Sequence, residues 1–449
     1  KTLREVVRLA KFFRLVKNEY IKTLKKLSTK IMLLLVVLAG IALAGIGAFG
    51  KHQMSTNYYT DDTNNYDEQI DWLEKTKPDG YEEQLILFNY LNKAGLSYDD
   101  KRYEVAEALA NTFSGAELEG YLNTLLVEND WKTICTVLKN SAVSEGDKWA
   151  YQYRLDNDIP FGDSWKDDVI TQAAQAKTAL SASDSEGVSS DEADRYKALE
   201  EQEKIAIYRL ENNIESNTAE NMSLFETYKA EQINFWTVFY TSASMISIIG
   251  LLIIVVAGSS VASEFSQGTI KFLLINPVKR WKILMSKYFT VISLGYIMLL
   301  LLYLVMIPAS GLFIGFEGIS APYLYVDNGT VHSMSSFLHA AQMYLLNSIS
   351  IVIMATLAFA VSSLFRSAAF SIGISVFLML AGNTIVSVLK VFNQDWARYL
   401  VFSNTDLASI AEGTPMFAQQ SLTFAIIVLA AHMAVFILTA WDGFVKREV

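Results

Sequence analysis

Residues 263–287 read SEFSQGTIKFLLINPVKRWKILMSK and lie between two long stretches without charge. No charged residue occurs from 232 to 263 or from 288 to 316. Each gap exceeds the roughly 20 apolar residues that a helix needs to cross a bilayer. The segment itself carries five basic residues against the single acid Glu264. By the positive-inside rule, this imbalance predicts a short cytosolic loop between two membrane helices.

Six segments of the chain are apolar and long enough to span a membrane. The predicted spans are residues 31–50, 237–262, 288–308, 345–365, 368–389 and 421–441. Residues 1–30 hold ten Lys or Arg against two acids, which predicts that they lie in the cytosol. An even number of spans then returns the tail, 442–449, to the same side. The sequence predicts an all-α, multi-pass membrane protein with both termini cytosolic.

The charge of the chain is concentrated between the first two spans. Its 449 residues are 52% hydrophobic yet carry a net charge of −10. Residues 51–236 contain 37 acids against 17 bases and only two prolines, so we expect a soluble, mostly α-helical extracellular domain. A surface this acidic repels polyanions, which argues against a nucleic-acid partner.

Helical apolar spacing within this domain occurs at residues 81–96, 103–109, 117–139 and 192–214. The sequence YRLDNDI at 153–159 returns as YRLENNI at 208–214, with five of seven positions identical. We interpret this echo as a duplicated helical element that packs alike twice; a paired ligand site is the alternative. The lone cysteine, Cys135, excludes an intrachain disulfide.

Residues 1–30 have apolar side chains every three or four positions, with most of the bases between them. This pattern predicts an amphipathic helix with a basic face, lying in the plane of the inner leaflet. Packing against a cytosolic partner is a compatible alternative, because such a helix has two sides.

The chain lacks the usual signatures of catalysis. It contains no G-x-x-x-x-G-K-[ST] phosphate loop, no H-E-x-x-H zinc motif and no G-x-S-x-G nucleophile elbow. We therefore expect no enzyme activity, catalytic residue, metal or cofactor in this chain. A few polar residues inside the spans either contact a substrate or join helices through hydrogen bonds. These candidates for a substrate path are Asn383, Thr384, Ser348 and His432.

The loop of residues 263–287 is expected to form a rigid knob below the membrane. Gly268 and Thr269 end the second span, residues 270–274 form a short helix, and Pro277 ends that helix. Arg280 then opens the next helix. Glu264 is expected to have a partner, since it is a single acid at a basic membrane edge.

This segment resembles the coupling region of type-2 ABC exporter permeases, the ABC-2 membrane subunits. In that family an acid, Gly-Thr, two leucines, Pro-Val, Arg-Trp and a lysine follow the second span. The matching residues here are Glu264, Gly268, Thr269, Leu273, Leu274, Pro277, Val278, Arg280, Trp281 and Lys287. Asn18 and Glu19 lie in a stretch similar to the gate helix of that family, and residues 402–413 resemble its external turn.

The resemblance implies the membrane-spanning half of a bacterial exporter in the cytoplasmic membrane. Such a subunit pairs with a second copy or a related permease. It also binds two cytosolic ATPase subunits, which hold the ATP and Mg that this chain does not bind. Residues 309–344 would be an extracellular loop, and residues 390–420 an extracellular turn or re-entrant segment.

Many members of that family have only a short loop between the first two spans, whereas this chain has residues 51–236 there. Some Gram-positive permeases for peptide export carry such insertions, so an antimicrobial or other peptide, or an amphipathic compound, is the expected substrate. The alternative hypothesis is a membrane receptor or scaffold that binds a peptide or envelope partner through this domain.

Overall fold

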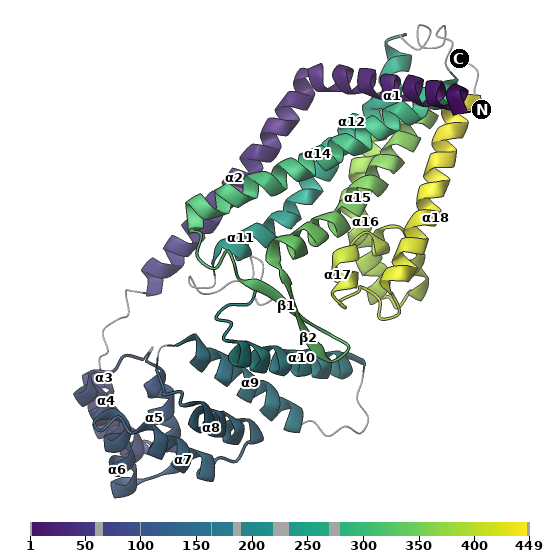
Figure 1. Ribbon diagram of the computed structural model, residues 1–449. Coiled ribbons are helices and arrows are strands. Elements are labelled where there is room, and N and C mark those ends of the chain that lie inside the picture. The colour runs from purple at the N-terminus through teal and green to yellow at the C-terminus, as the bar shows by residue number, and fades with distance from the viewer. Residues whose placement is uncertain are drawn as a thin grey trace. The chain divides into compact units, whose positions relative to one another are not determined.

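The computed structural model describes residues 2–58, 66–98, 100–162, 164–182, 190–218, 233–268 and 279–446 (Figure 1). The chain divides into two compact units. The first, which we call the membrane unit, comprises Lys1–Met54, Asn221–Ile319 and Phe337–Val449. The second, the helical unit, comprises Ser55–Glu220 and Ser320–Ser336.

The membrane unit is built from long helices. They are α1 (Thr2–Lys25), α2 (Leu27–Tyr58), α11 (Phe235–Thr241), α12 (Ile246–Ser266), α14 (Arg280–Ile314), α15 (Ser336–Phe365), α16 (Ala368–Val391), α17 (Leu407–Ala411) and α18 (Leu422–Trp441). Among the described residues, six helical segments are long and apolar enough to cross a membrane. This confirms the prediction of an all-α membrane protein.

Two helices extend beyond the spans predicted for them. Helix α14 begins at Arg280 and continues through Pro308 to Ile314, and α15 begins at Ser336 rather than at 345. A single proline costs one backbone hydrogen bond, which a long apolar helix packed among neighbours accommodates. The segment 309–344 is therefore not a simple loop, because it contains the ends of two helices.

A β-hairpin occupies the rest of that segment. Strand β1 (Pro322–Asp327) pairs antiparallel with β2 (Thr330–Ser335) in the helical unit. The turn residues Asn328 and Gly329 have φ values of 49° and 80°, as a two-residue type I′ turn requires. The buried Leu324 donates its N–H to Asn217 Oδ1 at 3.0 Å. The Asn-Gly pair was a signal for this hairpin that the sequence analysis missed.

The helical unit contains eight further helices among the residues that the structure describes. They are α3 (Tyr66–Thr76), α4 (Tyr81–Ala94), α5 (Lys101–Thr112), α6 (Gly115–Leu126), α7 (Trp131–Ser141), α8 (Glu145–Asn157), α9 (Trp165–Ala182) and α10 (Ser190–Asn212). The helical spacing over 117–139 belongs to two helices, α6 and α7. Asn129 has a φ of 56° and Asp130 caps α7, so the chain turns there.

The two copies of the echo end their helices in the same way. Asp158 and Asn213 both adopt the left-handed conformation, with φ values of 54° and 53°. The next residue in each copy donates its N–H five positions back, to Arg154 O at 3.0 Å and to Arg209 O at 2.9 Å. This is the hydrogen bond of a Schellman helix end, so both copies form one type of helix terminus.

Each copy also buries its arginine. Arg154 and Arg209 are 6% and 4% exposed. Arg154 forms an ion pair with Asp167 at 2.6 Å and donates to Pro160 O, while Arg209 donates to Glu215 O at 2.5 Å. In both copies the guanidinium binds carbonyls of the chain that follows its own helix. The echo is thus a repeated structural element, as the first interpretation holds.

Cys135 provides a probe of this unit. The side chain is 0% exposed, and burial raises the pKa of its thiol to about 12. Because the thiolate is the reactive form, we expect the native protein to resist a maleimide at pH 8. Full labelling is expected only in denaturant, measured by mass spectrometry. Rapid labelling of the native chain would show that the core around α7 opens.

Candidate functional site

A buried ion pair joins the two helices that flank residues 267–279. Glu264 lies in the last turn of α12, and Lys287 lies in the third turn of α14. Both side chains are only 3% exposed, and Lys287 Nζ lies 2.9 Å from Glu264 Oε1. Two charges this deeply buried need each other, because an unpaired one would keep its full desolvation cost.

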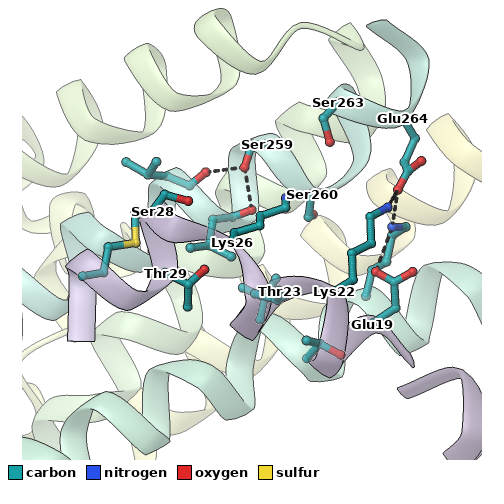
Figure 2. A pocket seen from close by; sticks show the side chains of 16 residues that line it. Glu19, Lys22, Thr23, Lys26, Ser28, Thr29, Ser259, Ser260, Ser263 and Glu264 are labelled. Atoms are coloured by element: carbon teal, nitrogen blue, oxygen red, sulfur yellow. Dashed lines mark hydrogen bonds and ion pairs between the residues drawn. The ribbon is translucent and has the colours of Figure 1, made fainter. Parts of the chain in front are cut away.

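Helix α1 adds a second pair of charges. Lys287 also donates to Glu19 Oε2 at 3.0 Å, and Lys22 donates to the same Glu264 oxygen that Lys287 contacts. We call these four residues, Glu19, Lys22, Glu264 and Lys287, the ion cluster. Its charges alternate in sign, so that each buried group contacts two groups of opposite charge. Figure 2 shows Glu19, Lys22 and Glu264 converging at this point.

Local sequence explains how these groups meet. Gly268, with a φ of 68°, ends α12 by donating its N–H to Phe265 O, and α14 starts twelve residues later at Arg280. Helix α1 packs on α14 and crosses the ends of α12 and α14 in Figure 1. Glu19 and Lys22 are three residues apart, so α1 presents both from one face.

Aromatic side chains form a second set of contacts near this end of the helices. Trp281, at the start of α14, stacks on Trp441 of α18 with ring centroids 6.3 Å apart. Arg366, in the turn between α15 and α16, lies 4.4 Å above the ring of Phe265, which meets Phe444 edge-on. These contacts connect the helices flanking 267–279 to the end of α18.

The predicted coupling residues are only partly described. Glu264 has the partner that was expected for it, and Arg280 opens α14 as predicted. The expected short helix at 270–274, with Thr269, Leu273, Leu274 and Pro277, lies outside the described residues. Of the two gate-helix residues, Glu19 joins the ion cluster, whereas Asn18 is exposed.

Lys22 and Lys26 were not singled out from the sequence. Together with Glu19 they recur at intervals of three and four residues, with Glu19 and Lys22 on α1 and Lys26 directly after its last residue. The three-residue spacing places Glu19 and Lys22 on one face of α1, and it was the signal that could have found Lys22.

The four polar residues proposed for a substrate path lie on three different helices. Ser348 is 2% exposed and donates to Leu345 O at 2.6 Å, with Tyr296 Oη 3.4 Å away on α14. His432 Nδ1 lies 2.8 Å from Val428 O of its own helix, and Asn383 and Thr384 are exposed on α16. The structure does not place these residues around one cavity. Ser348 bonds mainly to its own helix, and its contact with α14 is the longer one.

Residues 212–449 match the family described as "Protein of unknown function (DUF2705)". They contain five of the six candidate spans and two members of the ion cluster. This chain belongs to the DUF2705 family. The DUF2705 part begins in the last residues of α10, so α1, α2 and most of the helical unit precede it.

Two relatives come from Bacillus subtilis strain 168. The uncharacterized protein YhcI is 35% identical over 244 residues, which cover 54% of this chain and 74% of YhcI. The uncharacterized membrane protein YdbK is 32% identical over 199 residues, which cover 44% of this chain and 76% of YdbK. No solved structure matches the chain. The description of YdbK as a membrane protein and the six candidate spans among the described residues agree with a multi-pass membrane protein.

Proposed function

We propose that this chain is the membrane-spanning permease subunit of an ATP-driven ABC exporter in the bacterial cytoplasmic membrane. The ion cluster carries the proposal, because it fastens the two helices that flank residues 267–279 to each other and to α1. The excess of bases in residues 1–30 and 263–287 supports a cytosolic location for this end of the membrane unit.

The sequence contains no phosphate-binding loop of its own, so an exporter of this kind needs a partner that hydrolyses ATP. Residues 267–279 are the natural contact, since they connect two spans. A displacement of this segment would move α12 and α14 together, because their charges are paired in a low-dielectric environment. Helix α1 would follow through Glu19 and Lys22.

The proposed assembly contains two ATPase subunits, which bind ATP and Mg, and a second permease, either a copy of this chain or a relative. The proposed substrate is a peptide or an amphipathic compound that leaves the cell. Residues 51–236 would lie outside the cell, where their acidity keeps them soluble.

Cross-linking from the edge of the loop tests this proposal. Lys279 is exposed and directly precedes α14. A photo-reactive amino acid at this position is expected to capture a protein with a P-loop in intact cells. The control is the same substitution at Lys390, an exposed residue near the end of α16, which should capture no such protein. Capture of only lipid or of proteins without a P-loop at Lys279 would contradict the proposal.

A further inference from the structure

A cavity of about 90 Å³ lies beside the ion cluster, enclosed by α1, α2, α12 and α14. Its lining contains both polar and apolar side chains. Figure 2 shows the polar part of the lining, where Lys26 extends from the end of α1 toward Ser259 and Ser260 of α12. The apolar part of the lining consists of Met32, Val255, Val256 and Val291. A lining of both kinds fits a ligand that is itself amphipathic.

The charged groups of the lining do not cancel. Three lysines, Lys22, Lys26 and Lys287, face two carboxylates, Glu19 and Glu264, which leaves one positive charge in excess. Lys22 and Lys287 are in the ion cluster, whereas no carboxylate among the described residues lies within ion-pair distance of Lys26.

The electrostatic environment of Lys26 agrees with an excess of positive charge in the lining. Although the residue as a whole is exposed, burial of its ammonium group lowers its pKa, and the charges of Lys22 and Lys287 lower it further. Glu264 and Glu19 act in the opposite direction but do not outweigh them. Burial disfavours charge of either sign, but the repulsion from Lys22 and Lys287 is a cause that an additional anion would relieve.

Hydroxyl groups complete the polar part of the lining. Thr23 and Ser28 come from the region where α1 meets α2, and Ser259, Ser260 and Ser263 come from α12. Ser259 and Ser260 donate to carbonyls of their own helix, at 2.8 Å in each case. A serine hydroxyl can rotate from such a bond to donate to an oxyanion instead.

We propose that this cavity binds the phosphodiester headgroup of a membrane phospholipid. A phosphodiester carries a single negative charge, which matches the single positive excess, whereas a phosphomonoester carries about −1.5 to −2 at pH 7. The acyl chains would continue from Met32 along α2, where Leu35, one turn further, is 47% exposed. This apolar path favours a lipid over a free phosphate ion as the source of the group. The inference does not depend on the exporter activity.

The test compares two neighbouring lysines in the purified full-length chain. Lys26 lines the cavity, whereas Lys25 is also exposed but does not line it. Native mass spectrometry would follow the binding of short-chain phosphatidylglycerol in detergent. Lys26→Gln is expected to weaken binding roughly five-fold or more, the effect of losing one charge-assisted contact. Lys25→Gln is expected to bind like the wild type.

A competition experiment distinguishes a lipid from a free phosphate ion as the source of the phosphate group. The competitors are inorganic phosphate and glycerophosphoglycerol, which lacks acyl chains. Neither is expected to displace the lipid when present at the same concentration. Equal lipid binding by both variants would overturn the proposal, as would displacement of the lipid by inorganic phosphate. An unchanged elution volume would show that each variant is folded.

Discussion

The Glu264→Gln variant is expected to lose about 3–5 kcal/mol of stability in the membrane unit, because it leaves a buried charge without its partner. Lys287 is 3% exposed and would retain only Glu19, while Lys22 would lose its described partner. The measurement is the free energy of unfolding of the purified chain, obtained by titrating a mild detergent with sodium dodecyl sulfate and following tryptophan fluorescence.

Two controls test whether the loss of stability comes from the unpaired buried charge. The double variant Glu264→Gln, Lys287→Gln is expected to recover much of the stability, since removing both members of a buried pair costs less than removing one. The exposed pair Asp71–Lys75 gives the surface comparison, and Asp71→Asn is expected to cost under about 1 kcal/mol. Equal instability of the single and double variants would contradict the account, as would a neutral Glu264→Gln.

The second large effect is expected from Gly146→Ala in the helical unit. A Cβ atom at this position would lie 2.0 Å from Ala174 O and 2.3 Å from Thr178 Oγ1 of α9. Because a backbone carbonyl cannot move aside as a flexible side chain can, α8 and α9 must separate. The expected cost is about 1–3 kcal/mol. Labelling of Cys135, in the neighbouring α7, should then proceed roughly 5- to 150-fold faster.

Gly120→Ala provides the matched control. This glycine lies inside α6, and among the described residues no atom lies within 4 Å of the position that its Cβ would take. Alanine is a better helix former by about 1 kcal/mol, so the labelling of Cys135 should stay the same or become slower. If Gly146→Ala labelled at the wild-type rate, the close packing of α8 on α9 would be wrong.

The spans could be predicted from the sequence, but much of the helical unit could not. A charge-free run of 20 residues has few interpretations, so each of the six spans left a clear signal. Helix α8 left none, because the residues that it buries are Gly146, Ala150 and Arg154. These are two small residues and an arginine rather than a stripe of large apolar side chains, which is the pattern that periodicity detects.

The candidate site shows a similar limit. Glu264 could be found because a lone acid at a basic membrane edge requires a partner. The identity of that partner could not be found from local pattern, since Lys22 lies 242 positions away in the chain and Lys287 lies 23 away. The packing of α12 on α14 brings Lys287 to Glu264, and the packing of α1 brings Lys22 there.

The most direct test of the exporter proposal is gentle extraction of the native protein, followed by identification of what co-purifies with the intact chain. The account predicts a protein with a P-loop in near-equal amount and ATP hydrolysis by the purified complex. Finding an intact, folded chain with no ATP-hydrolysing subunit would contradict it. A membrane receptor or scaffold that acts through residues 51–236 would then be the better explanation.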